Sequence, residues 1–181
     1  MDGELAAERL SAISTFSATE EGVTRPPWTR EHEAALGEIR HWMEDAGLSV
    51  ELDAAGTLVG RSPNPAGKPL ILMGSHQDSV PNGGRFDGIM GIALACLAAK
   101  RFKARWDALP VGIEVLAFAD EEGVRFPTAL IGPRALAGTL DPAVFEMSDR
   151  QGVSMRAAMG AFGADPDSAL ALRRDPSTIA G

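Results

Sequence analysis

Residues 70–88 read LILMGSHQDSVPNGGRFDG, and this stretch decides the fold. Its first four residues are all apolar, which is typical of a strand covered on both faces in a parallel sheet. Residues 88–102, GIMGIALACLAAKRF, are apolar nearly all round, so we expect a helix packed on that sheet. A second apolar strand is predicted at 111–118. The order strand, helix, strand predicts a right-handed crossover whose strands end at one edge of the sheet, where ligands gather in open α/β folds.

Elements on either side of this unit complete an α/β pattern. Apolar residues recur at helical spacing within 6–16 and 36–46, which predicts two amphipathic helices. Alternating apolar and polar residues at 48–52, followed by the turn DAAG at 53–56, predict a β-hairpin. The later sequence predicts only short helices, at 129–137 with an interruption at Gly132-Pro133, at 155–162 and at 169–173. Together these signals predict a mixed, centrally parallel sheet flanked by helices.

The composition of the chain restricts the classes of binding partner and the cellular compartment that we expect for it. The chain has 181 residues, 45% of them hydrophobic, which is enough for one substantial core. Its formal charge of -8 does not favour nucleic acid or an anionic membrane surface as a partner. Cys96 is the only cysteine, which excludes an intrachain disulfide and favours a reducing compartment, the cytoplasm. The sequence shows neither an export signal nor an apolar run of ~20 residues, so we expect no membrane anchor.

A histidine and an aspartate follow the first apolar strand. His76 lies where that strand is expected to end and Asp87 lies just before the crossover helix, which places both at the same edge of the sheet. Imidazole and carboxylate are common metal ligands, and one carboxylate can bridge two ions ~3.5–4 Å apart. In an extended chain residues 76 and 78 face the same way. We therefore expect the Asp78 carboxylate to accept a hydrogen bond from the His76 ring and to fix its tautomer.

Adjacent carboxylates follow the second apolar strand. Residues 120–123 read DEEG, which brings Glu121 and Glu122 to the edge that holds His76 and Asp87. One glutamate is suited to bind metal and the other to accept a proton from water, whose pKa a metal lowers from 15.7 towards ~7. Spacing alone does not say which glutamate has which role.

Each of these signals also has an ordinary structural interpretation. A lone histidine at a strand end is usually a hydrogen-bonded core or surface residue, a Gly-Gly pair can be a turn, and acidic residues often lie at a helix N-terminus. The combination at the ends of two neighbouring strands favours a metal site. We interpret His32 and His41, on the second expected helix, as solvated or helix-packing residues, and Cys96 as a core residue rather than a nucleophile.

The same motifs resemble a known family. Residues 74–88, GSHQDSVPNGGRFDG, and 118–126, FADEEGVRF, closely resemble the allantoate amidohydrolases and N-carbamoyl-L-amino-acid hydrolases. The resemblance covers most of the chain, through GVTR at 22–25, WM at 42–43, DAAG at 53–56 and RALAG at 134–138. It implies a phosphorylase/hydrolase-like catalytic domain in an enzyme that splits ureido or N-carbamoyl groups, with release of ammonia and carbon dioxide.

The resemblance also implies a metal centre with two divalent ions, zinc or manganese. His76 would bind one ion, Asp87 would bridge both, and Glu122 would bind the second. Glu121 would act as the general base, and Asp78 would hold His76 in place.

Asn82 and Arg125 stand in the matching motifs, and the resemblance implies that they help to bind a small ureido or carbamoyl substrate. Family members are longer and homodimeric, with a second domain for dimerisation and closure and two further histidine ligands. This sequence lacks those histidines, which leaves each ion one protein ligand short of three. We therefore expect residues 1–181 to be the N-terminal part of the catalytic domain, with little or no activity alone.

Two other functions are compatible with the sequence. An aminoacylase or aminopeptidase of the same structural group would use the same residues on acyl or peptide amides. A non-catalytic module that has lost its metals would keep the fold without the ions. The metal-site residues do not discriminate among substrates, because the closure domain that selects substrate lies outside this sequence.

Overall fold

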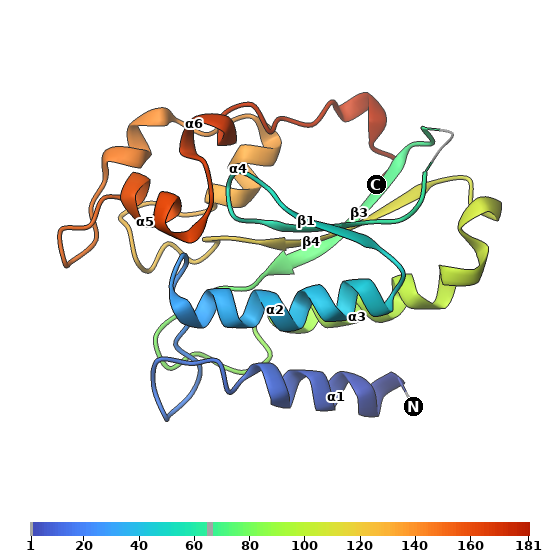
Figure 1. The fold of residues 1–181 in the computed structure, drawn as a ribbon, viewed down its shortest axis with the longest axis horizontal. Helices are drawn as coiled ribbons and strands as arrows, with labels where there is room; N and C mark the ends of the chain where they lie inside the picture. The colour runs from blue at the N-terminus through green and yellow to red at the C-terminus, as the bar shows by residue number, and fades with distance from the viewer. Residues whose placement is uncertain (1, 65–66) are drawn as a thin grey trace.

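Four strands form one mixed sheet in the computed structural model, which describes residues 2–64 and 67–181 (Figure 1). The strands are β1 (Ser49–Leu52), β2 (Leu58–Arg61), β3 (Leu70–His76) and β4 (Gly112–Phe118), in the order β1-β2-β4-β3 across the sheet. β2 pairs antiparallel with both β1 and β4, whereas β3 runs parallel to β4. The predicted hairpin, and the predicted mixed sheet built on a parallel pair, are confirmed.

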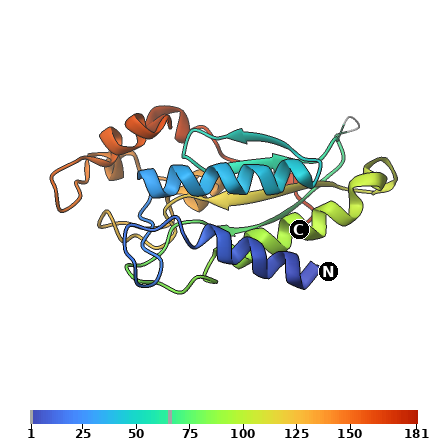
Figure 2. The same cartoon turned by 60° about the horizontal axis from the view of Figure 1, so that its bottom comes forward.

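Helices cover both faces of the sheet. α2 (Arg30–Asp45) and α3 (Ile89–Phe102) lie along one face, and α1 (Asp2–Ile13) packs beneath α3 (Figures 1 and 2). The opposite face carries α4 (Ile131–Ala137), α5 (Met155–Phe162) and α6 (Pro166–Ala169). Short 3-10 helices occur at η1 (Lys103–Ala108), η2 (Pro142–Glu146) and η3 (Pro176–Thr178).

Two apolar clusters hold these layers together. The larger lies between helices α1 to α3 and the sheet, and includes Trp42, Ile92 and Val115. The second gathers Trp28 and Phe126 with side chains of α4, α5 and η2. Burial of apolar surface stabilises a fold by about 25 cal/mol per Å². The second cluster therefore fixes the segment that follows β4, which carries the two glutamates, to the body of the domain.

The expectation that the first apolar strand is covered on both faces is wrong. β3 lies at the edge of the sheet in the part of the chain that the structure describes, and Ile71 is 36% exposed. β4 lies between β2 and β3 and is buried over almost its whole length. Among the described residues, the outer side of β3 is paired near its start, where Leu72 N donates to Gly181 O at 2.8 Å and Ala180 N donates to Leu70 O at 2.8 Å. An apolar run predicts burial but does not say which strand is central.

Two helix predictions are corrected in detail. The helix expected at 169–173 is instead α6, because Asp165 accepts hydrogen bonds from Asp167 N and Ser168 N and so starts the helix earlier. α4 runs through Gly132-Pro133 without interruption, since a proline in the first turn gives up no helical hydrogen bond.

The prediction that the apolar helix packs on the sheet is confirmed. α3 contacts β3 and β4, and α1 and α2 pack against it as well. Its apolar surface is not buried all round, since Met90 and Leu94 are 45% and 49% exposed.

Within residues 2–64 and 67–181 no helix combines the length and the apolar character needed to cross a membrane. The single cysteine, Cys96, is buried in α3, where burial raises the pKa of its thiol to about 12. The interpretation of Cys96 as a core residue agrees with this placement.

The parallel pairing of β3 with β4 requires a glycine at position 74. A Cβ atom there would lie 2.1 Å from the carbonyl oxygen of Leu116, on the neighbouring strand. We expect Gly74→Ala to lower the free energy of unfolding by about 3 kcal/mol, as overpacking against backbone does. Urea unfolding followed by circular dichroism measures it. Gly37→Ala in α2, where a Cβ meets nothing within 4 Å, should instead raise stability by up to about 1 kcal/mol. Equal effects of the two substitutions would contradict this packing.

Candidate metal centre

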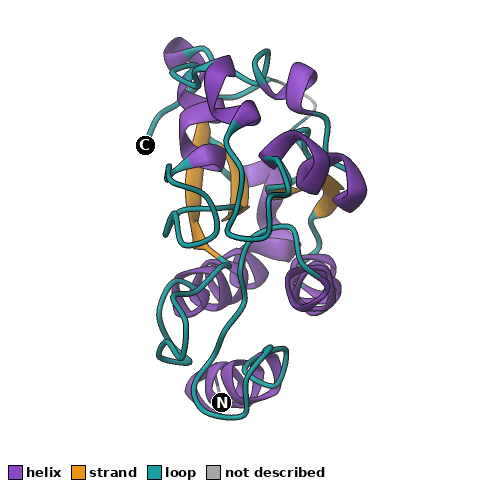
Figure 3. Cartoon of the chain, turned by 90° about the vertical axis from the view of Figure 1, so that its left-hand side faces the viewer, coloured by secondary structure: helices purple, strands orange, loops and turns teal. Residues whose placement is uncertain are grey.

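The carboxyl ends of β3 and β4 lie side by side. Their parallel register pairs His76 with Phe118, so the residues after both strands emerge at the same edge of the sheet. Loops dominate this end of the molecule, which faces the viewer in Figure 3. The predicted convergence of the two motifs at one edge follows directly from this register.

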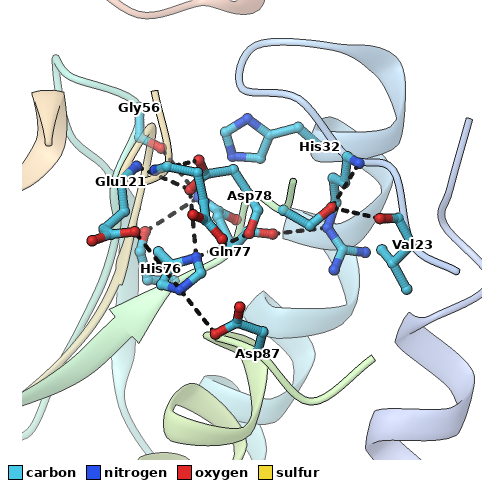
Figure 4. A network of polar contacts seen from close by, with 12 residues as sticks. Val23, His32, Gly56, His76, Gln77, Asp78, Asp87 and Glu121 are labelled. Atoms are coloured by element: carbon cyan, nitrogen blue, oxygen red, sulfur yellow. Dashed lines mark hydrogen bonds and ion pairs between the residues drawn. The ribbon is translucent and has the colours of Figure 1, made fainter. Parts of the chain in front are cut away.

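Three of the predicted residues meet there. His76, Asp87 and Glu122 each present a ligand atom, and these atoms all lie within 4.8 Å of one another. The Nε2 atom of His76 is 3.6 Å from Oδ1 of Asp87 (Figure 4). The imidazole is mostly buried, with 11% of its side chain exposed, whereas Asp87 is 62% exposed. We call these three residues the His-Asp-Glu cluster.

Glu121 points towards the same ring. Its Oε2 atom lies 4.0 Å from Nε2 of His76, and its side chain is 39% exposed (Figure 4). The pKa of neighbouring Glu122 is raised, first by burial and then by the nearby carboxylates of Asp87 and Glu121, against an opposing effect of His76. The three carboxylates and one imidazole thus form an acidic group that attracts cations.

Asp78 holds His76, but not in the way that we expected. The Nδ1 atom of His76 is 2.9 Å from the backbone oxygen of Asp78, whereas the Asp78 carboxylate is 3.8 Å away. That carboxylate accepts hydrogen bonds from the backbone N–H groups of Glu121 and Glu122, both at 3.1 Å. The predicted side-chain contact is replaced because two amides from the end of β4 already occupy the carboxylate.

The carbonyl contact fixes the tautomer of His76. A carbonyl oxygen can only accept a hydrogen bond, so Nδ1 carries the proton and Nε2 keeps its lone pair. That lone pair faces Asp87 and Glu121. The expected tautomer, with Nε2 unprotonated, is therefore set by the main chain of Asp78 and not by its side chain.

Gly88 leaves room for the imidazole. It has φ of +64°, and a Cβ atom at this position would lie 2.5 Å from Cε1 of His76. Only glycine combines this backbone conformation with such a close approach. The glycine after Asp87 is therefore needed at this site and does more than form a turn.

Asp120 is a site residue for which the sequence predicted no role. It is fully buried with φ of +52°, and neither carboxylate oxygen has a hydrogen-bond partner among the described residues. Burial, followed by the charge of Asp78, raises the pKa of Asp120 to about 8. Its position inside the DEEG run gave the only signal, and nothing in that run distinguishes it from a solvated carboxylate.

Asn82 and Arg125 lie outside the His-Asp-Glu cluster. The side-chain oxygen of Asn82 accepts a hydrogen bond from Thr19 at 2.9 Å. Arg125 donates to the carbonyl oxygens of Pro27 and Trp28, each at 2.8 Å, and pairs with Asp149 at 3.1 Å. It also lines a cavity of about 510 Å³.

The other two histidines do not join the cluster. His32 is completely buried and stacks on Phe162 with 4.7 Å between ring centroids, and burial lowers the pKa of its ring to about 3. His41 is exposed on α2. Both placements agree with the interpretation that these residues are not ligands.

The sequence profile of peptidase family M28 matches residues 54–158, which contain the whole cluster. The chain belongs to this family. The N-carbamoyl-L-amino acid amidohydrolase of Geobacillus stearothermophilus is 40% identical over 99% of this chain and 44% of its own length. The allantoate deiminase of Arabidopsis thaliana is 38% identical over 81% of this chain and 29% of its own length. The resemblance inferred from the motifs is thus confirmed, and the chain spans less than half the length of these relatives.

Solved structures of the family share the fold. A hydantoinase/carbamoylase family amidase from Burkholderia ambifaria superimposes with a TM-score of 0.80 at 30% identity, over 90% of this chain and 40% of that one. The predicted α/β fold, a mixed sheet flanked by helices and shared with this group of hydrolases, is confirmed by this likeness.

The raised pKa of Asp120 predicts a pH dependence of stability. The carboxyl pKa rises from an ordinary 3.8 to about 8 on folding, so between these values the folded state binds more protons than the unfolded state. In the metal-free chain the free energy of unfolding should therefore fall as pH rises from about 4 to about 8. Asp120→Asn should flatten this fall, as measured by urea unfolding across that range. The exposed Asp107→Asn controls for loss of one negative charge, and equal slopes in wild type and Asp120→Asn would contradict the assignment.

Proposed function

We propose that this chain carries the metal-binding part of the active site of a hydrolase that cuts a ureido or N-carbamoyl carbon-nitrogen bond. The meeting of His76, Asp87 and Glu122, with ligand atoms within 4.8 Å of one another, carries this proposal. The names of the relatives, N-carbamoyl amino acid amidohydrolase and allantoate deiminase, support the substrate class.

The donor set fits two divalent ions of the zinc or manganese type. It combines an imidazole nitrogen with carboxylate oxygens, and the free lone pair of His76 Nε2 faces Asp87. Asp87 has two oxygens and suits the bridging position, with His76 on one ion and Glu122 on the other. Bound ions would supply electrostatic stabilisation of the developing oxyanion and a lowered pKa for nearby water.

The protein's own groups would handle the proton and the orientation of the site. Glu121 is the proposed general base, because its carboxylate is partly exposed and lies 4.0 Å from Nε2 of His76. Asp78 keeps the His76 ring in the Nδ1–H form. Asn82 and Arg125 are proposed to help bind substrate, and the cavity that Arg125 lines supports that role for Arg125.

The longer protein would be needed for turnover. One histidine and two carboxylates cannot give three protein ligands to each of two ions, unlike most catalytic zinc sites. We propose that residues 1–181 form part of the catalytic domain, and that the remaining ligands and a dimerisation and closure domain belong to the complete homodimeric enzyme. Its substrate would be a small molecule, and the lone buried Cys96 favours the cytoplasm as its compartment.

An aminoacylase or aminopeptidase activity is the alternative within the same family. The profile that matches is that of a peptidase family, and the cluster itself does not discriminate between amide and ureido carbonyls. A panel of allantoate, N-carbamoyl amino acids, N-acyl amino acids and dipeptides, tested on the complete enzyme, separates these activities.

Metal titration tests the ligand assignment. Isothermal calorimetry with zinc and with manganese should show binding to the chain that His76→Ala or Asp87→Ala weakens by more than about 100-fold, since each substitution removes a ligand. His41→Ala is the matched control, because His41 is exposed on α2 and outside the cluster. Unchanged affinity in His76→Ala would refute the site, and a chain that binds neither ion would favour a non-catalytic module.

Turnover tests the need for further ligands. We expect the 181-residue chain, supplied with zinc or manganese, to release no measurable ammonia from allantoate or from N-carbamoyl amino acids. A complete family member assayed in parallel is the positive control. Robust turnover by this chain alone would contradict the proposal that its ligand set is incomplete.

A further inference from the structure

Arg25 is a buried cation that contacts the segment carrying His76 and Asp78. It is 2% exposed, and no carboxylate forms an ion pair with it among the residues that the structure describes. Its guanidinium instead donates to three backbone carbonyls, those of Ile13 at 3.0 Å, Phe16 at 3.0 Å and Gln77 at 2.8 Å. A charge without a carboxylate partner is rarely buried unless its position matters to the structure.

The contacts of Arg25 join two distant parts of the chain. Ile13 is the last residue of α1, where a positive charge is favourable because the final carbonyls of a helix lack partners. Gln77 directly follows β3 and lies between His76 and Asp78. Arg25 therefore fastens the end of β3 to the end of α1.

The backbone around Arg25 strengthens the same link. Arg25 N donates to Oγ of Ser79 at 3.0 Å, and Ser79 N donates to the carbonyl oxygen of Arg25 at 3.2 Å. The hydroxyl of Ser79 in turn donates to the carbonyl oxygen of Val23 at 2.9 Å (Figure 4). Arg25 and Val23 thus hold Gln77 and Ser79, the residues on either side of Asp78.

Asp78 is left with its two polar groups aimed at the cluster. Its carbonyl oxygen accepts from His76 Nδ1, and its carboxylate accepts from the N–H groups of Glu121 and Glu122. The carbonyl of Asp78 belongs to the peptide group that Asp78 shares with Ser79, whose N–H donates to the carbonyl oxygen of Arg25. The preceding peptide group, between Gln77 and Asp78, is held by the guanidinium of Arg25 through the Gln77 carbonyl oxygen. Loss of the guanidinium would free this preceding peptide group and so loosen the backbone of Asp78.

We infer that Arg25 is a positioning residue for the metal centre, which acts through Gln77 and Asp78 to keep His76 in the tautomer that leaves Nε2 free. Burial lowers the pKa of Arg25 to about 10, with an opposing effect from Asp78, so the guanidinium stays charged and able to donate at neutral pH. This inference rests on the proposed function for its purpose but can be tested in the metal-free chain.

The three histidines of the chain make the test direct. Long-range proton-nitrogen NMR spectra, recorded where imidazoles are neutral, report which ring nitrogen carries the proton. His32 accepts a hydrogen bond from Trp28 N on Nδ1 at 2.8 Å, so it should show the Nε2–H pattern. His76 should show the opposite Nδ1–H pattern. Arg25 and Gln77 also lie near the His32 ring, but its tautomer is set by Trp28 N, so the Nε2–H pattern reports a folded core.

Arg25→Met should convert His76 from the pure Nδ1–H form to a mixture of tautomers, with His32 unchanged. Arg25→Lys keeps the charge but loses the planar guanidinium, so it should give the same shift to a smaller degree. If Arg25→Met unfolds, which loss of the His32 pattern would show, Arg25→Lys is the variant that tests the inference. Added guanidinium should partly restore the Nδ1–H form in Arg25→Met. Arg61→Met, which breaks an ion pair with Glu114 at 2.8 Å near the start of β4, is the matched control and should leave His76 unchanged.

Zinc affinity gives the second readout. Arg25→Lys should weaken zinc binding by about 10- to 100-fold, as loss of support for a ligand does, whereas Arg61→Met should not. Retention of a pure Nδ1–H form of His76 in a folded Arg25→Met or Arg25→Lys variant would overturn the inference. Absence of zinc binding in the wild-type chain would instead count against the proposed function, and the tautomer result would stand apart from it.

Discussion

The site depends on the carboxylate of Asp78, which accepts two backbone N–H groups from the segment after β4. These two hydrogen bonds, from Glu121 and Glu122, tie the end of β3 to the end of β4. Asp78 is 1% exposed, and burial raises the pKa of its carboxyl group against the effect of these amides. A buried carboxylate is tolerated when its lone pairs accept hydrogen bonds. The amides of Glu121 and Glu122 therefore allow Asp78 to remain charged, and the Asp78 carboxylate in turn fixes the backbone of the two glutamates.

Charge is concentrated at this end of the sheet at some expense to stability. Asp120 is buried, its carboxylate has no hydrogen-bond partner among the described residues, and the charges of Asp78 and Glu121 act on it. Repulsion among such carboxylates favours protonation or a bound cation. Apolar packing on both faces of the sheet offsets this repulsion, as does the positive charge of Arg25, which contacts Gln77 beside Asp78. Carboxylates with raised pKa values close to one another are typical of a functional site.

The sequence could predict the elements that carry the cluster, because their signals are local. An apolar strand, a glycine-rich loop, an apolar helix and a second apolar strand imply a crossover unit, and its topology alone brings His76, Asp87 and Glu122 to one edge. The edge position of β3 could not be predicted, since strand order depends on contacts between distant segments. Neither could the use of the Asp78 main chain in place of its side chain, because the choice is decided by amides from β4. The role of Arg25 could not be predicted for the same reason, since its guanidinium donates to backbone carbonyls, which every residue has.

The central claim is that one imidazole and two carboxylates at the ends of β3 and β4 hold metal. The most direct measurement is a crystal structure of the chain soaked with zinc, with anomalous diffraction recorded at the zinc absorption edge. We expect a zinc peak ~2.0–2.2 Å from Nε2 of His76 and from a carboxylate oxygen of Asp87, with Glu122 beside it. Zinc bound through Nδ1 of His76, or found only at sites away from these residues, would contradict it.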